Sequence, residues 1–274
     1  MITPTIYGIF EATTYSWQYI VADMGTMTAA IVDPVLDYNR PTRTFTNETA
    51  NSMVAFIREV GLRVDKILET HVHEDHVSAA SYLQQWLAYV QGSIPPIYIG
   101  GRSSQQAHNS DGPQVFPREE YRGAIWKPLM DHEVFSIGRL RVRVVPLPGH
   151  SPHHIGYQIG DNILCGDSIL NPDLGTARCD LPGSDAQLLF ESCQQILSLP
   201  DHVRIWPGHD YLPAGRSEPI AWTTVGDQKQ KNKSLRSGIT KEEFVRQQTQ
   251  EDLKLAKPEA IYSHFRQSWA LGAF

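Results

Sequence analysis

Hydrophobic residues in the first third of the chain fall into short runs that alternate with polar turns. Three such runs are rich in β-branched residues and predict strands at 17–23, 28–34 and 64–68. Gly25 separates the first two runs, which predicts a hairpin. Between residues 47 and 61 the apolar positions recur at helical spacing, with Asn47 or Thr49 as the N-cap, and a second helix begins near Val77. This order of elements indicates a layered α/β architecture.

The second half of the chain continues the strand pattern and then changes character. Further strands are predicted at 94–101, 133–145, 155–159, 162–165 and 203–206, and a helix at 187–199. Residues 102–126 are polar and irregular, which predicts a surface or site-lining loop. From Ala221 onwards helical and polar segments dominate. We therefore expect one domain over residues 1–274, with a core at about 1–212 and a helical C-terminal extension at about 213–274.

Composition and charge exclude several classes of function. The 274 residues are 41% hydrophobic and 20% charged, which is typical of a soluble globular protein. A net charge of −6, with no concentrated basic segment, argues against nucleic acid as a partner. No apolar run reaches membrane-spanning length, and the first residues do not resemble a signal peptide. We expect a soluble cytoplasmic protein without a membrane partner, with a mitochondrial location as the alternative.

The three cysteines do not form a recognisable framework. Cys165, Cys179 and Cys193 contain no CxxC pair, which favours a reducing compartment over disulfide bonding. Cys179 is interpreted as a buried, inert thiol, because reactivity requires a lowered pKa.

Metal-type side chains are concentrated in one stretch directly after the predicted strand 64–68. His71, His73, Asp75 and His76 fall within six residues. On extended backbone His71 and His73 would point the same way. A strand end, a turn and a helix start would then bring all four groups to one rim.

Three later turns each follow a predicted strand and each supply one more such side chain: His150, Asp167 and His209. Imidazole and carboxylate groups suit zinc, iron or manganese, and the lack of a cysteine ligand argues against a structural thiolate zinc site. Any one of these histidines could simply cap a turn. Their recurrence at strand ends favours a metal site.

The order of these residues resembles the metallo-β-lactamase superfamily, which implies an αββα sandwich with the metal site at one edge of its sheets. Several segments are similar to the persulfide dioxygenase (sulfur dioxygenase) branch of that superfamily: 31–37, 67–73, 166–170, 173–180 and 209–211. The Gly-Thr-Ala-Arg-Cys-Asp segment is the most specific of them. The similarity continues into the tail and covers nearly the whole chain.

The resemblance implies a mononuclear non-haem Fe(II) enzyme, with one iron per chain, that oxidises glutathione persulfide or a related thiol persulfide with O₂ to sulfite. The implied iron ligands are His71, His150 and Asp167. Two histidines and a carboxylate on one face leave positions for substrate sulfur and O₂. The other members of the set would hold ligands and solvent by hydrogen bonds: His73, Asp75, His76 and His209. Of these, Asp75 and His209 are the candidate catalytic residues.

Arg178 and Tyr211 match the positions at which this branch contacts glutathione. A guanidinium suits a carboxylate of the tripeptide, and a phenol supplies one more donor. Alternatively, Arg178 bonds loop carbonyls. His153 and His154 are interpreted as lining their loop or capping the next strand.

Two departures from the branch affect the expected substrate. Glu74 replaces the usual alanine, and the stretch 265–272 lacks an Asn and an Arg that help to hold glutathione. Losing one such buried, charge-assisted contact costs about 2 kcal/mol of binding free energy. The metal chemistry is thus expected to be retained and the substrate pocket altered.

Two other functions compete with this one. A hydrolase of a thioester or lactone, similar to glyoxalase II, would use all seven metal-type residues to bind two zinc ions or a zinc–iron pair. Asp75 would then orient the hydroxide that the two metals generate. A binding protein that has kept the fold and lost catalysis is the third hypothesis, and the intact ligand set argues against it. The sequence leaves a homodimer open.

Overall fold

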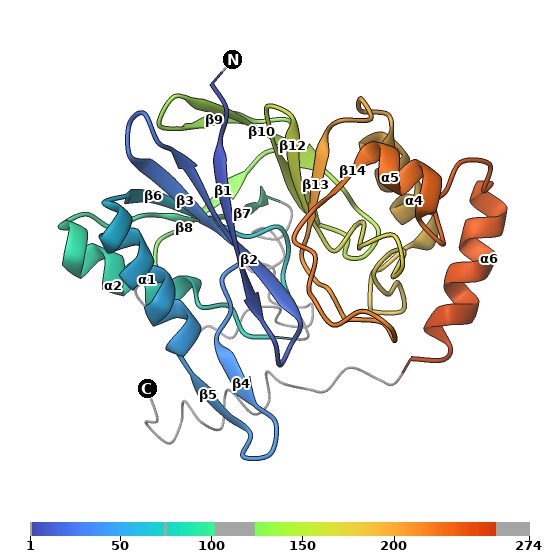
Figure 1. Cartoon of the computed structure of the whole chain (residues 1–274), viewed down its shortest axis with the longest axis horizontal. Helices are drawn as coiled ribbons and strands as arrows, with labels where there is room; N and C mark the ends of the chain where they lie inside the picture. Colours follow the sequence, from blue (N-terminus) through green and yellow to red (C-terminus); the bar gives the residue numbers. More distant parts are fainter. Residues whose placement is uncertain (1, 74–75, 102–123, 256–274) are drawn as a thin grey trace.

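Two mixed six-stranded β-sheets form the centre of the molecule (Figure 1). The computed structural model describes residues 2–73, 76–101 and 124–255. The first sheet has the order β1-β2-β3-β6-β7-β8. Its strands are β1 (Thr5–Glu11), β2 (Ser16–Asp23), β3 (Thr28–Val32), β6 (Arg63–Leu68), β7 (Ile97–Gly100) and β8 (Trp126–Leu129).

The second sheet is built from the second half of the chain and has the order β14-β13-β12-β11-β10-β9. Its strands are β9 (Val134–Ile137), β10 (Leu140–Pro146), β11 (Ile155–Ile159), β12 (Asn162–Gly166), β13 (Arg204–Pro207) and β14 (Thr223–Thr224). β14 belongs to the C-terminal tail and pairs with β13, so the tail begins as part of this sheet. A small hairpin of β4 (Asp37–Asn39) and β5 (Thr44–Thr46) projects from the body (Figure 1).

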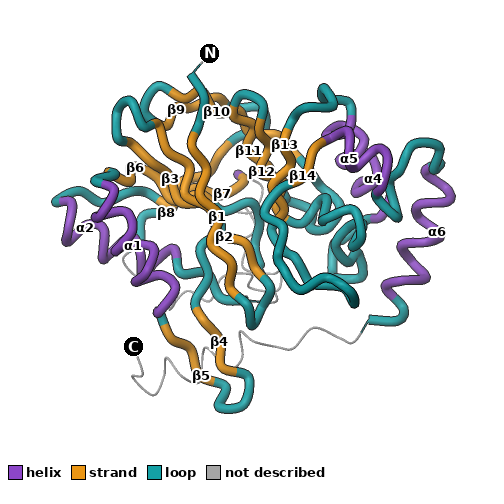
Figure 2. Tube along the Cα trace, in the orientation of Figure 1, coloured by secondary structure: helices purple, strands orange, loops and turns teal. Residues whose placement is uncertain are grey.

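Helices lie on the outer face of each sheet (Figure 2). α1 (Glu48–Val60) and α2 (Ala80–Gln91) pack on the first sheet. The second sheet is covered by α4 (Ala186–Leu197), with α5 (Val225–Lys231) and α6 (Lys241–Asp252) packed against α4.

Three hydrophobic clusters hold these layers together, and strand β2 shows how. Ile20 and Ala22 belong to the cluster under α1 and α2, whereas Tyr19 and Val21 belong to the cluster between the two sheets. Successive side chains of a strand point to opposite faces, so a strand buried on both sides reads as one apolar run. Every residue of β2 is accordingly buried. Together with the third cluster, beneath α4, this confirms the expected αββα sandwich.

Most predicted elements are present, and the differences have physical causes. The predicted hairpin is the antiparallel pair β2–β3. Asn47 occupies the N-cap position of α1 without a side-chain cap bond, and the Thr49 amide and hydroxyl instead donate to Asp37. β1 was not predicted, because as an outer strand it is mostly half-buried and carries no run of buried positions. Nearly all of the predicted loop 102–126 lies outside the described residues.

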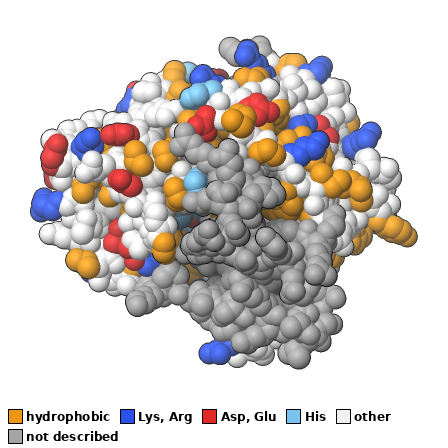
Figure 3. Space-filling model, turned by 180° about the vertical axis from the view of Figure 1, so that it is seen from behind, with side chains coloured by type: hydrophobic (Ala, Val, Ile, Leu, Met, Phe, Trp, Pro, Cys, Tyr) orange, Lys and Arg blue, Asp and Glu red, His pale blue; other side chains and the backbone are white. Residues whose placement is uncertain are grey.

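On the face seen in Figure 3, acidic and basic side chains are interspersed among apolar ones. Among the described residues, no helix combines the length and apolar character needed to cross a membrane. The assignment of the whole chain to one domain stays a prediction.

Candidate metal centre

Three buried side chains converge where strands of both sheets end. His71 follows β6 of the first sheet, and Asp167 follows β12 of the second. The Nε2 atoms of His71 and His150 lie 3.6 and 3.7 Å from Oδ2 of Asp167. These distances are long for hydrogen bonds, but two metal–ligand bonds of roughly 2.1 Å can span up to about 4.2 Å. The three groups therefore fit a shared metal ion.

Hydrogen bonds on the far side of each ring orient both imidazoles. The Thr70 hydroxyl donates to Asp33 Oδ2 at 2.8 Å, so it accepts from Nδ1–H of His71 at 2.9 Å. Nδ1 of His150 donates to the Arg178 carbonyl at 2.8 Å. In both rings the hydrogen on Nδ1 leaves a lone pair on Nε2 that faces Asp167. Burial and the neighbouring histidines also hold the pKa of His71 well below its usual value, which favours the neutral, metal-binding form.

Two glycines allow the backbone to bring these ligands together. Gly149, before His150, has φ +143°, and a Cβ there would lie 2.3 Å from the backbone nitrogen of Leu189. Gly166, before Asp167, has φ +50°, and a Cβ there would lie 2.5 Å from the Thr70 hydroxyl. A side chain at either position would strain the backbone and push the ligand turn outwards.

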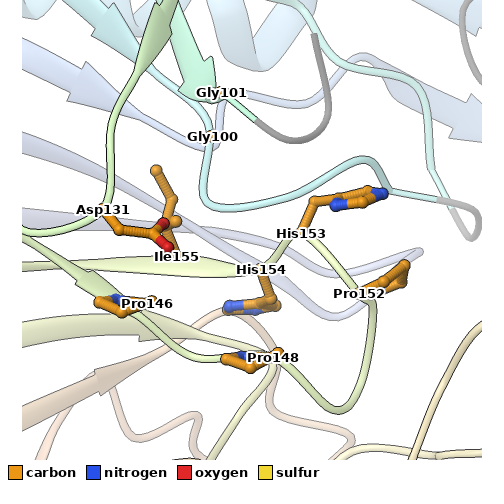
Figure 4. A pocket seen from close by; sticks show the side chains of 9 residues that line it. All are labelled: Gly100, Gly101, Asp131, Pro146, Pro148, Pro152, His153, His154 and Ile155. Atoms are coloured by element: carbon orange, nitrogen blue, oxygen red, sulfur yellow. The ribbon is translucent and has the colours of Figure 1, made fainter. Parts of the chain in front are cut away.

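His154 is a further buried imidazole in contact with the centre. Its Nε2 accepts a hydrogen bond from the Asp167 amide at 3.1 Å, and its ring stacks on His71 with centroids 4.6 Å apart. Burial lowers the pKa of His154 to about 3, so the ring is neutral. Figure 4 shows it beside Pro148 in the lining of a small pocket, to which His153 also contributes. His154 directly precedes β11, the loop position expected for it, whereas its contact with the metal ligand Asp167 was not predicted.

His73 belongs to a separate cluster of buried acids. Its Nε2 lies 3.3 Å from Glu69 Oε2 and 3.5 Å from Asp33 Oδ1. Asp33 also accepts from the Thr70 amide, and Glu69 accepts from the Ser78 hydroxyl. Burial alone would lower the pKa of His73, but its bonds to the two carboxylates raise it above the usual value. The ligand atoms of Asp33, Glu69 and His73 lie within 4.8 Å of one another, so this group could also hold a cation.

The sequence predicted that His71 and His73 point the same way from extended backbone, and β6 ends at Leu68, before both of them. Their rings are 4.0 Å apart, yet they serve different clusters. Asp33 and Glu69 were not singled out from the sequence. The available signal was an acid directly after each of two apolar strands.

His209 lies beside the centre with both ring nitrogens engaged. Nδ1 lies 2.8 Å from Asp167 Oδ1, and Nε2 lies 3.1 Å from the Ser16 hydroxyl. His76 is buried nearby, with its ring 4.1 Å from that of His73 and 5.6 Å from that of His209. Asp75 and Glu74 lie outside the described residues, so the role expected for Asp75 stays a prediction.

The two expected substrate contacts lie close to the centre. The Arg178 guanidinium binds both oxygens of Asp180 at 2.6 and 2.7 Å, while its carbonyl holds His150. Tyr211 is 44% exposed and stacks on the buried His209, with centroids 5.3 Å apart and planes within 7°. It therefore forms an accessible rim above buried polar groups. The divergent stretch 265–272 lies outside the described residues.

Comparison with known proteins gives a family for this arrangement. The family model described as metallo-beta-lactamase superfamily matches residues 13–209, which include every ligand of the centre. A beta-lactamase hydrolase-like protein of Xylella fastidiosa is 38% identical over 94% of the chain, and the chain spans only 58% of that relative's length. Glyoxylase B2 of Dictyostelium discoideum is 35% identical, over 89% of the chain and 82% of the relative.

Persulfide dioxygenases also occur among the relatives. The mitochondrial persulfide dioxygenase ETHE1 of Bos taurus is 26% identical, over 92% of the chain and 83% of the relative. The crystal structure of ETHE1 from Myxococcus xanthus superimposes with a TM-score of 0.72 at 24% identity, covering 98% of this chain and 99% of that one. This likeness supports the αββα fold of the described residues.

Proposed function

The chain belongs to the metallo-β-lactamase superfamily, and from that premise we propose that it is a mononuclear non-haem iron dioxygenase. Its substrates would be O₂ and a thiol persulfide such as glutathione persulfide, and its product sulfite. The observation that carries the proposal is the buried triad of His71, His150 and Asp167, whose ligand atoms lie within 4.8 Å of one another. Two histidines and one carboxylate with open positions are the usual ligand set of non-haem Fe(II) oxygenases.

The protein groups around the triad have definable roles in such a reaction. Fe(II), when bound, would supply adjacent sites at which persulfide sulfur and O₂ are activated. His71, His150 and Asp167 would hold it, with Nε2 of each ring presented by the bond at Nδ1. All three ligands are at least nine-tenths buried, so the groups that react there are shielded from bulk water.

Recognition of the thiol carrier is proposed for the rim of the site. The Arg178 guanidinium is held by Asp180, and a substrate carboxylate would share or replace that partner. Tyr211 offers an exposed phenol above His209. The Bos taurus relative carries the name persulfide dioxygenase, which supports this substrate class.

A second candidate function is hydrolysis of a thioester or lactone at a two-metal site. It is favoured by the names of more similar relatives, glyoxylase B2 and beta-lactamase hydrolase-like protein. It is also favoured by the presence of Asp75, His76 and His209 in the sequence. A two-metal centre would require lone pairs from His73 and His209, and hydrogen bonds already engage both nitrogens of His209.

The two functions are separated by metal content and oxygen consumption. The chain is purified without added metal, its metals are counted by plasma emission, and oxygen uptake is followed with glutathione persulfide. We expect about one iron per chain and O₂ uptake matched by sulfite. His73→Gln should retain the metal, because His73 is not part of the triad. Two zinc ions per chain with thioester cleavage and no O₂ uptake would contradict the dioxygenase.

A further inference from the structure

Helix α6 of the C-terminal tail carries two buried polar side chains. Its buried residues are Phe244, Gln248 and Asp252, which recur every four positions and so form one stripe along the helix. Phe244 packs its ring 5.3 Å from that of Phe190 on α4, whereas Gln248 and Asp252 are 7% and 8% exposed. Burying an amide and a carboxylate costs free energy unless hydrogen bonds compensate, so the partners of these two groups determine what they contribute.

Gln248 binds the segment 176–179, which has no helix or strand. Its amide nitrogen donates to the Ala177 carbonyl at 3.1 Å and to Asp252 Oδ1 at 2.9 Å. Its amide oxygen accepts from the Thr176 hydroxyl at 2.8 Å. Both ends of one buried amide are therefore used to attach this segment to α6.

Asp252 holds the same segment one turn further along α6. Its Oδ2 accepts from the Cys179 amide at 3.2 Å, while Oδ1 accepts from Gln248. Ala177 and Cys179 flank Arg178 in the sequence. Helix α6 therefore fixes the backbone on both sides of Arg178.

The backbone held in this way is connected directly to the metal centre. The Arg178 carbonyl accepts from Nδ1 of His150 at 2.8 Å, and the Cys179 thiol donates to the Gly149 carbonyl at 3.3 Å. The orientation of the His150 ring thus depends on where this carbonyl lies. The guanidinium of Arg178, bound to Asp180, is the proposed contact for a substrate carboxylate.

The residues before this segment are attached to the tail in the same manner. The Gln228 side chain on α5 donates to the Leu170 carbonyl at 2.9 Å, and the Asn232 side chain, just after α5, donates to the Gly175 carbonyl at 3.1 Å. Gln228 and Asn232 are at most 1% exposed. The tail therefore holds the loop that follows Asp167 at successive points.

We infer that Gln248 and Asp252 are positioning residues that act through the backbone at Arg178. They hold the His150 ring for metal binding and the guanidinium at the rim for substrate binding. The part that concerns substrate rests on the proposed function, whereas the part that concerns the metal does not. The C-terminal extension thereby contributes to the site, although α6 itself lies at the outer edge of the molecule (Figure 1).

The test measures metal affinity and substrate kinetics in the full chain. Gln248→Met keeps the length of the side chain and removes the hydrogen-bonding amide. Competition for Zn²⁺ alone with a chromogenic chelator should show a metal affinity about tenfold lower, the lower end of effects from partners of metal ligands. The KM for glutathione persulfide should also rise, by no more than in Arg178→Ala, because displacing a guanidinium should not cost more than deleting it.

A matched control and a graded pair of variants separate this role from general damage to the helix. Gln247→Met is the control, because the Gln247 amide bonds Glu243 within α6 at 2.9 Å, and both readouts should stay at the wild-type values. Asp252→Ala should change both readouts in the same direction as Gln248→Met. Asp252→Asn, which can still accept one of the two hydrogen bonds, should lie between Asp252→Ala and wild type. Thermal unfolding of each metal-free variant measures fold stability.

A double variant tests whether the effect on substrate passes through Arg178. Adding Gln248→Met to Arg178→Ala should lower Zn²⁺ affinity, because the backbone carbonyl is still displaced, and should not raise the KM further. A further rise in KM equal to that of Gln248→Met alone would overturn the route through the guanidinium.

The remaining outcomes distinguish the inference from the proposed function. Unchanged Zn²⁺ affinity in Gln248→Met would overturn the inference, whatever the change in unfolding temperature. Equal effects in Gln247→Met would also overturn it, because they would then come from α6 in general. If wild type consumed no O₂ with glutathione persulfide, the proposed function would fail, and the Zn²⁺ titrations would still decide whether α6 positions His150.

Discussion

His71 and His209 are both buried imidazoles beside Asp167, and they differ in what stands behind each ring. Behind His71, Thr70 and Asp33 draw the hydrogen to Nδ1, so that Nε2 faces the carboxylate with a lone pair. Behind His209, the Ser16 hydroxyl contacts Nε2 at 3.1 Å, and Nδ1 faces the Asp167 carboxylate at 2.8 Å. The 3.6 Å separation of His71 Nε2 from Asp167 leaves room for a metal ion between them, whereas His209 Nδ1 contacts Asp167 directly at 2.8 Å.

The sharpest test of this difference removes each ring in turn. His71→Ala deletes one of three ligands, and we expect metal affinity to fall more than about a thousandfold, with activity lost, because two ligands rarely hold a divalent ion. His209→Ala should still bind about one metal per chain. Metal analysis after dialysis measures both variants. Equal metal loss in the two variants would show that His209 is itself a ligand.

A smaller effect is expected when only the hydrogen bonds that link Asp33 through Thr70 to His71 are removed. Thr70→Val keeps the shape of the side chain and removes the hydroxyl between Asp33 and His71. Metal affinity should fall roughly 10- to 100-fold, since the ring loses the bond that fixes its tautomer. Competition with a chromogenic chelator measures this change. An unchanged affinity would mean that packing alone orients the ring.

The second ligand ring, His150, is held by a backbone carbonyl, so it should tolerate loss of the Arg178 side chain. Its outer nitrogen bonds the carbonyl of Arg178, which Arg178→Ala retains. We expect unchanged metal content and a KM for glutathione persulfide raised about tenfold, equivalent to about 1.4 kcal/mol. Oxygen-electrode kinetics together with metal analysis test this. A loss of metal with unchanged KM would assign the side chain a structural role instead.

The smallest effect is expected at Cys179, whose thiol bonds the Gly149 carbonyl in the turn that carries His150. Burial raises the pKa of Cys179 to about 12, so at neutral pH the group is a protonated thiol rather than a thiolate. Alkylation by iodoacetamide should therefore be slow at pH 7 to 8 and accelerate only as pH rises towards that pKa. Mass spectrometry of the labelled peptide follows the rate. Rapid labelling at pH 7 would contradict the raised pKa.

The sequence predicts the layers of this fold better than the roles of its polar residues. Strands β2 and β3 are buried runs that the sequence pattern predicts directly, and His71, His150 and Asp167 follow predicted strands. Which nitrogen of a histidine is free depends on contacts between residues far apart in the chain, such as Ser16 and His209. No local pattern encodes those contacts. The contacts of His73 with Asp33 and Glu69 were missed for a related reason, because Asp33 follows a different strand.

The ligands of the centre come from both sheets, and this has a consequence for how the protein folds. His71 follows a strand of the first sheet, whereas His150 and Asp167 follow strands of the second. Neither half of the chain therefore contains all three ligands. A bound metal would cross-link the two β-sheets, each of which has its own hydrogen bonds. It therefore stabilises only the state in which the sheets are packed together. Removal of the metal by a chelator should therefore destabilise the interface between the sheets before it disrupts the hydrogen bonds within either sheet. Hydrogen exchange would detect this as lost protection where Thr70 meets Ile155, while the centres of β2 and β11 stay protected.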